Sequence, residues 1–134
     1  MIRLRTLPAA FLLSVVAGCA PMATTPTGAE AGRYLVYFNE FSAYLLPDAQ
    51  NVVATAAQRA KETGARTVLV QGRASATGSA AANQKLTETR TQIVYDQLQK
   101  DGVNPTIIQQ QPLGQATTTD TSVMDRRVDI VLYK

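Results

Sequence analysis

An arginine within an apolar helical stripe is the residue of this chain best suited to binding chemistry. Between residues 80 and 100, one face of the expected helix carries Leu86, Ile93, Val94 and Leu98. At about 100° per residue, Arg90 falls inside that face. A buried guanidinium costs several kcal/mol unless it is paired. We therefore expect Arg90 to meet a carboxylate, either one from this chain, such as Asp120 or Asp125, or one from a bound ligand.

Two polar residues near Arg90 in the sequence are further candidates for the same site. Asn83 lies one turn before Leu86 on the apolar face, and Ser75 lies in the glycine-rich segment 72–78. The amide of Asn83 suits either stabilising that segment or contacting a ligand. Ser75 carries no charge, and a solvated loop or a helix start suits it better than a ligand contact.

The residue types that catalysis needs are mostly missing. The chain has no histidine, which excludes a Ser-His-Asp triad and histidine ligands for zinc. It also has no Ser-x-x-Lys motif, phosphate-binding loop or dinucleotide-binding fingerprint. A pair formed by Ser75 and Lys85 is the weak remaining candidate for a nucleophile and its base. We therefore predict a binding protein that is not an enzyme and uses no cofactor or metal.

The N-terminus has the pattern of a secretory signal. Two arginines precede an almost wholly apolar run at 7–16, which is too short to span a membrane as a helix. The run ends in Val-Ala-Gly-Cys, and Cys19 is the only cysteine. This ending resembles the bacterial lipobox, which implies cleavage after residue 18 and acylation of Cys19. The alternatives are ordinary cleavage that leaves a free thiol, or an uncleaved apolar N-terminus.

The segment after the signal is expected to be a tether. Residues 19–33 are rich in Ala, Thr, Pro and Gly and show no apolar periodicity, so the folded domain is expected at 34–134. Ala20 follows the cysteine, and by analogy with lipoproteins this favours the outer membrane. The chain has 13 basic and 10 acidic side chains, and loss of Arg3 and Arg5 with the signal leaves a net charge of +1. Charge therefore gives no support for nucleic-acid binding.

Hydrophobic periodicity predicts a small α/β (α+β) domain. The expected elements are a strand at 33–38, a helix at 47–64, a strand at 67–71, a helix at 80–100, and strands at 103–109 and 127–133. Pro105 is expected at the start of its strand or on a sheet edge, and 110–124 as a polar loop. Because so few elements cannot cover both faces of a sheet, they predict a β-α-β-α-β-β two-layer sandwich with a mixed sheet and both helices on one face. The aromatic residues expected in the core or on the sheet, rather than in a sugar-stacking platform, are Tyr34, Tyr37, Phe38 and Tyr95.

Four segments of the domain resemble one known family. They are FNEFSAYLLPDAQNVVATAA, VQGRASATGSAAANQKLTETRTQIVYDQL, GVNPTIIQQQPLGQ and DRRVDIVLYK, in the family's order and spacing. Together they make the chain similar to the outer-membrane-protein-A-like C-terminal domain over nearly all of residues 35–134. The most specific residues are Gly72, Gly78, Asn83, Leu86, Arg90, Arg126, Arg127 and Val128. The resemblance implies non-covalent binding of peptidoglycan.

The family's ligand site is only partly matched. In the family, a loop aspartate and a helix arginine clamp the ammonium and the carboxylate of a diaminopimelate residue in the peptide stem. Arg90 matches the arginine and Asn83 matches a helix asparagine, but Ser75 stands in place of the aspartate. Arg73 also replaces a histidine, and Asn39 replaces a common aspartate. The resemblance therefore implies an intact carboxylate-binding half and an ammonium-binding half without its usual charge.

Residues before the last strand are the remaining site candidates. Asp125 replaces a family asparagine, and we hypothesise that its carboxylate compensates for the aspartate missing at Ser75. Arg126 and Arg127 begin an alternating strand, so they are expected on opposite faces, and Arg127 is favoured to reach the site.

The combined interpretation is a lipid-anchored envelope protein. Its resemblance implies binding of peptidoglycan stem peptides that links the outer membrane to the cell wall, with the domain in the periplasm. The alternative is an interaction or assembly protein of the envelope that keeps the fold but has lost peptidoglycan binding, and Ser75 and Arg73 are the residues that support it. A third possibility, based on Arg73 and Arg90 lying close together, is a carboxylate ligand without the extra ammonium.

Overall fold

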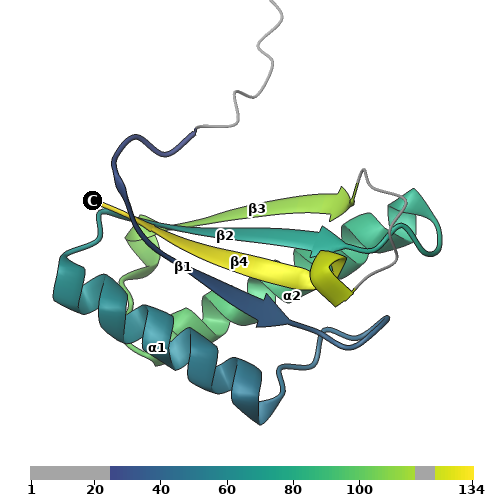
Figure 1. Ribbon diagram of the computed structural model, residues 1–134, viewed down its shortest axis with the longest axis horizontal. Helices are drawn as coiled ribbons and strands as arrows, with labels where there is room; N and C mark the ends of the chain where they lie inside the picture. The colour runs from purple at the N-terminus through teal and green to yellow at the C-terminus, as the bar shows by residue number, and fades with distance from the viewer. Residues whose placement is uncertain (1–24, 117–122) are drawn as a thin grey trace, which may run out of the picture.

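The structure is a computed structural model that describes residues 25–116 and 123–134. Within these residues, a four-stranded sheet and two helices form two layers, with both helices on the same face of the sheet (Figure 1). The elements in chain order are β1 (Glu30–Tyr37), α1 (Pro47–Thr63), β2 (Thr67–Ala74), α2 (Ala80–Lys100), β3 (Ile108–Gln115) and β4 (Arg127–Tyr133). The predicted α/β sandwich with a mixed sheet is confirmed.

The last strand of the chain lies inside the sheet. The strand order is β1-β4-β2-β3, and β4 pairs antiparallel with both β1 and β2. β2 and β3 are parallel because α2 carries the chain back across the sheet between them. The helix-facing side chains of β4, which are Val128, Ile130 and Leu132, are fully buried in the core. β4 therefore ties the first strand to the β2–α2–β3 unit.

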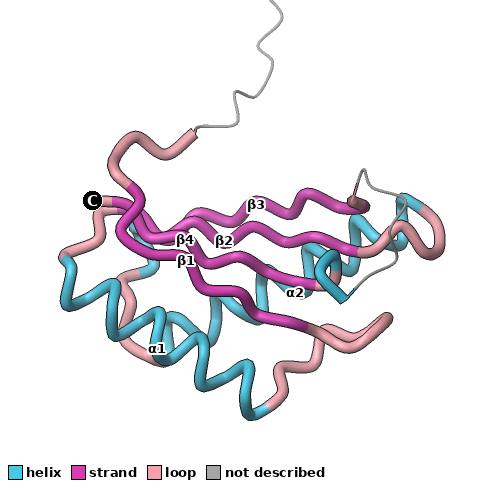
Figure 2. Tube along the Cα trace, in the orientation of Figure 1, coloured by secondary structure: helices cyan, strands magenta, loops and turns pink. Residues whose placement is uncertain are grey.

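The two helices begin and end where the sequence predicts. α1 begins at Pro47 with Asp48 in its first turn, and it ends at Gly64, whose φ of 63° is the left-handed conformation that glycine favours. α2 begins after Ser79, whose side chain accepts a hydrogen bond from the main-chain N–H of Ala82. α1 packs over β1, and α2 packs over β2 and β3 (Figure 2). The first half of α2 consequently lies beside the end of β2.

The third strand differs from its prediction. The side chain of Asn104 accepts a hydrogen bond from the N–H of Thr106, and this turn starts a short 3-10 helix at Pro105–Ile107 instead of a strand. The strand follows at Ile108–Gln115, so the first part of the predicted 110–124 loop is in the sheet. β3 tolerates Pro112 because it is an edge strand. Part of the predicted loop, 117–122, lies outside the described residues.

The first strand also starts earlier than predicted. β1 begins at Glu30, so Glu30 and Gly32, which lie in the predicted tether at 19–33, pair with β4. Alanine and glycine in this stretch give no alternating pattern, which is why the strand start was missed. Residues 1–18, predicted to be a signal peptide, and Cys19 lie outside the described residues. None of the helices in the described part of the chain is long and apolar enough to cross a membrane.

Candidate functional site

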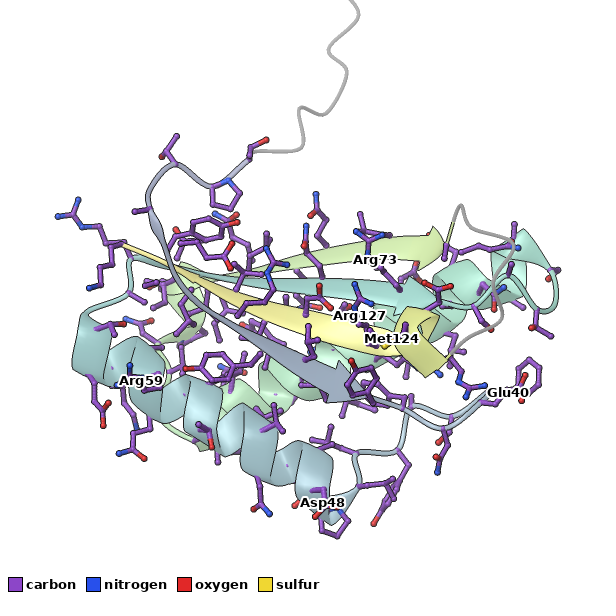
Figure 3. The ribbon with its side chains drawn as sticks, in the orientation of Figure 1. Glu40, Asp48, Arg59, Arg73, Met124 and Arg127 are labelled. Carbon is purple, nitrogen blue, oxygen red and sulfur yellow. The ribbon has the colours of Figure 1, made fainter. Side chains whose placement is uncertain are left out.

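Four segments meet at one end of the sheet and form a narrow depression. They are the loop after β1, the end of β2, the first half of α2 and the residue before β4. The main-chain N–H of Phe38 donates to the carbonyl of Arg126 at 2.9 Å, which keeps the loop after β1 beside the start of β4. The lining residues are Glu40, Phe41, Ala74, Ser75, Asn83, Leu86, Arg90 and Arg126. Figure 3 shows Glu40 on this loop, beyond the end of β1.

Arg90 lies at the base of the depression and is fully buried. Its Nε donates to the carbonyl of Ser42 at 2.8 Å, one Nη donates to Asn39 at 3.0 Å, and the other reaches Arg73 at 3.5 Å. The guanidinium carbon is 5.1 Å from the centre of the Phe38 ring, within the range of a cation–π contact. These three acceptors are main-chain carbonyls, whereas we predicted a carboxylate. Asp120, one of the predicted partners, lies outside the described residues.

The hydrogen bonds of Arg90 satisfy it only in part. A guanidinium has five N–H donors, and the three carbonyls use three of them. Carbonyls also carry no net charge. Burial, and secondarily the positive charge of Arg126, lowers the pKa of Arg90 to about 10. An anion entering the depression would relieve this unfavourable environment.

Arg126 is the second guanidinium of the depression. Its side chain is 19% exposed, and its Nη1 is 3.6 Å from a carboxylate oxygen of Glu40. Its Nε is buried and finds no hydrogen-bond partner among the described residues. Nε of Arg126 is therefore a donor without a partner in the described part of the chain, and a ligand carboxylate would suit it.

Arg126 and Arg127 point to opposite faces of the sheet, as predicted. The prediction that Arg127 is the one that faces the depression is wrong, because Arg126 does so. Nε of Arg127 donates to Asp129 at 2.7 Å on the face of the sheet away from the helices, where Figure 3 also shows Arg73. Arg126, which was not favoured, lines the depression. Arg73 likewise contributes its carbonyl to Arg90 while its side chain lies on the open face, so a pocket formed by the two guanidinium groups of Arg73 and Arg90 is wrong.

Asn83 and Ser75 both lie where the depression meets the loop after β2. The side-chain N–H groups of Asn83 donate to the carbonyls of Ser75 at 3.1 Å and Thr77 at 3.0 Å, so this residue stabilises the loop. Ser75 is 5% exposed on the lining. Glu40 is the residue of the described lining that carries a carboxylate, and the predicted site residue Asp125 is not part of this lining but ends the 3-10 helix at Val123–Asp125.

Sequence reasoning did not identify Glu40, and it considered Arg126 but favoured Arg127 in its place. The loop that carries Glu40 is irregular in sequence, and no periodic pattern indicates which way its side chains point. Strand alternation could have identified Arg126. Val128 had to face the core, and a residue two positions earlier in an extended strand points to the same face of the sheet.

The fold and the site together define a small α/β domain with two arginines in a depression at one end of its sheet. The OmpA family model matches residues 37–127, and the chain belongs to this family. No curated protein matches the chain.

Several solved structures are similar to this one. The peptidoglycan-associated lipoprotein from Burkholderia pseudomallei is 27% identical, with a TM-score of 0.67 over 74% of this chain and 89% of that chain. The OmpA-like domain of FopA1 from Francisella tularensis is 21% identical, with a TM-score of 0.65 over 74% and 70% of the two chains. The periplasmic domain of Helicobacter pylori MotB is 18% identical, with a TM-score of 0.62 over 74% and 68%.

Proposed function

We propose that this protein is anchored in the outer membrane through an acylated Cys19 and binds peptidoglycan stem peptides with its periplasmic domain. Membership of the OmpA family and the likeness to a peptidoglycan-associated lipoprotein support this proposal. The observation that carries it is a depression lined by two guanidiniums, Arg90 and Arg126, of which Arg126 has a buried Nε with no hydrogen-bond partner among the described residues. The proposal needs no catalytic step and no cofactor.

The proposed mechanism is reversible recognition of a carboxylate. The stem carboxylate binds at the depression and accepts hydrogen bonds from Arg126, with the charge of the buried Arg90 guanidinium behind it. These interactions are strong because the site is partly shielded from water. Acylation of Cys19 would keep the domain near the cell wall, so that a site of modest intrinsic affinity stays occupied. Membrane and wall would thereby be linked without a covalent bond between them.

A protein-binding role in the envelope is the second candidate. Phe41 and Tyr44 follow Glu40 in the loop after β1, and each is 67% exposed. Exposed aromatic side chains are common at the centre of protein interfaces. Under this alternative, the loop contacts another envelope protein and the depression no longer binds the wall.

Recognition of a carboxylate predicts a preference between two soluble ligands. A stem tripeptide with a free terminal side-chain carboxylate should bind at least about tenfold more tightly than its amidated form, because hydrogen bonds to charged groups are stronger than those to neutral groups. Isothermal titration of both peptides into the protein measures this difference. Equal affinities would contradict carboxylate recognition, and the absence of binding by either peptide would favour the protein-binding role.

The anchor is tested separately by Cys19→Ser. We expect the unmodified chain in the outer-membrane fraction of a bacterial host, and we expect the variant to lose metabolic labelling with a palmitate analogue and to leave that fraction. Immunoblots of separated inner-membrane, outer-membrane and soluble fractions, together with detection of the label, measure both effects. An unlabelled parent chain would show that the lipobox resemblance is misleading.

A further inference from the structure

The open face of the sheet, which is the face turned away from the helices, carries a cluster of charged side chains. Strand alternation places them out of phase with the core residues of the same strands, and they are Arg33, Arg73, Arg127 and Asp129. The carboxylate of Asp129 is 5% exposed, and its two oxygens contact Arg127 at 2.7 Å and Arg33 at 3.3 Å. Arg73 has no such carboxylate among the described residues. We refer to the three arginines as the open-face arginines.

Arg73 has an unfavourable position within this cluster. It lies directly opposite Arg127 in the register of β2 and β4, and like charges at opposed positions of antiparallel strands destabilise a sheet. Its Nε is buried and finds no hydrogen-bond partner in the described part of the chain. A neutral side chain would avoid both effects. An anion from outside the chain would offset both, because it can accept hydrogen bonds from the two guanidiniums together.

Apolar and aromatic side chains border this pair of arginines. Tyr37 lies next to Arg127 across β1 and β4, and its hydroxyl donates to the sulfur of Met124 at 3.7 Å. Met124 is 53% exposed, and Leu113 on the edge strand β3 is 41% exposed. Figure 3 shows Met124 beside Arg127 at this end of the sheet. This combination suits the headgroup region of a membrane, where cationic side chains meet lipid phosphates and amphipathic rings lie at the interface.

The chain before β1 would bring this face to a membrane. Cys19, the proposed site of acylation, lies eleven positions before Glu30, where β1 begins. Even when fully extended, a chain of that length reaches only about 36 Å, so the domain stays close to the bilayer. Figure 1 shows residues 25–29 leaving the start of β1 on the side of the sheet opposite the helices. The chain therefore leads to the anchor on the same side as the open-face arginines.

We infer that the open face of the sheet docks on anionic phospholipid headgroups of the membrane that holds the anchor, with a lipid phosphate bound by Arg73 and Arg127. The helices then face away from the bilayer, and the depression that contains Arg126 stays accessible at the end of the sheet. Docking on lipid and binding of the wall therefore use separate surfaces and can occur together. This inference depends on the proposed anchoring but not on the proposed binding of stem peptides.

The test uses tryptophan as a reporter of contact with lipid, because the chain has no tryptophan of its own. Met124→Trp places the reporter beside the open-face arginines, and Thr55→Trp places it on the exposed surface of α1 as a control. The full chain is reconstituted in vesicles of phosphatidylcholine alone, or of equal parts phosphatidylcholine and phosphatidylglycerol. Both lipids carry brominated acyl chains, which quench tryptophan on contact. We expect quenching of Met124→Trp to be stronger in the phosphatidylglycerol vesicles, and Thr55→Trp to stay unquenched in both.

Arg73→Gln, added to Met124→Trp, tests the assigned residue. Loss of one arginine at an anionic membrane surface should lower the ratio of docked to undocked domain about fivefold, and raising the salt concentration should also lower it. Arg59→Gln, which changes an exposed arginine of α1, should leave the quenching unchanged. Urea denaturation serves as the check on folding, and we expect Arg73→Gln to be at least as stable as the parent because its Nε has no partner to lose.

Docking and anchoring can fail separately in this experiment. In Cys19→Ser the retained apolar run at 7–16 holds the chain on the vesicle, so the quenching is measured whether or not Cys19 is acylated. Equal quenching of Met124→Trp in the two kinds of vesicle, or quenching that Arg73→Gln leaves unchanged, would overturn docking on anionic lipid while stem-peptide binding at Arg126 stands. Stronger quenching of Thr55→Trp than of Met124→Trp would show that the helices, and not the open face, lie on the membrane.

Discussion

Replacing Arg90 with alanine should lower the free energy of unfolding by about 3 kcal/mol or more. The side chain is fully buried, and its removal leaves a cavity beside Phe38 together with three carbonyls that lose their donor. Relief from burying a charge offsets part of this loss but does not satisfy the carbonyls. Urea denaturation followed by far-UV circular dichroism measures the change. Arg59→Ala, on the exposed surface of α1, should change stability by less than about 0.5 kcal/mol.

The conservative variant Arg90→Lys separates charge from hydrogen-bond geometry. Lysine keeps the positive charge, but its single ammonium cannot reach the carbonyls of Asn39 and Ser42 as a planar guanidinium does. We therefore expect Arg90→Lys to be destabilised as well, though less than Arg90→Ala. Stability of Arg90→Ala within about 1 kcal/mol of the parent would contradict a structural role for the three carbonyl bonds. In a binding measurement on Arg90→Ala, loss of folding and loss of a ligand contact would therefore give the same result.

Arg126→Gln should weaken binding of a stem peptide by about tenfold to a hundredfold, while it changes stability by less than about 1 kcal/mol. The reason is that the guanidinium is partly exposed, makes only a long contact to Glu40, and has an unpartnered Nε among the described residues. Its carbonyl, which bonds to Phe38, is unaffected by the change. Isothermal titration gives the affinity, and urea denaturation gives the stability.

Arg127→Gln is the matched comparison, because the neighbouring arginine lies on the other face of the sheet. Its bond to the buried Asp129 carboxylate is lost, so we expect reduced stability with unchanged affinity. The two variants should therefore show opposite patterns. If Arg127→Gln loses affinity in the folded protein and Arg126→Gln does not, the site lies on the open face of the sheet and our assignment is wrong.

Strongly periodic elements could be predicted from the sequence, and weakly patterned ones could not. α1 has a clear apolar stripe and α2 has a Gly102 stop signal after Lys100, so the bounds of both helices were predicted to within one residue, although the buried face of α2 is largely polar, with Asn83, Thr87, Arg90 and Thr91 beside Val94 and Leu98. β3 is a glutamine-rich edge strand that contains Pro112, and its composition is that of a loop. Its place in the sheet depends on pairing with β2, which is a tertiary effect.

The residues of the candidate site also divide into those that a sequence pattern could predict and those that it could not. Helical periodicity was sufficient to single out Arg90 as a buried cation, but it could not identify the carbonyls that bind it, because main-chain acceptors from a distant loop leave no mark in the sequence. Alternation predicted that Arg126 and Arg127 face opposite ways. Glu40 required the conformation of the loop after β1, including Phe41 with its left-handed φ of 52°, before it could be placed beside Arg126.

Co-sedimentation with purified peptidoglycan sacculi tests the central claim most directly. The chain carrying Cys19→Ser is incubated with insoluble sacculi in mild detergent and centrifuged, with Arg126→Gln treated in parallel at equal folded concentration. We predict that the parent protein is found in the pellet, that free stem peptide releases it, and that Arg126→Gln stays mainly in the supernatant. A folded parent protein that remains in the supernatant at high concentrations of sacculi would contradict wall binding. Equal sedimentation of parent and variant would place the wall-binding surface outside this depression.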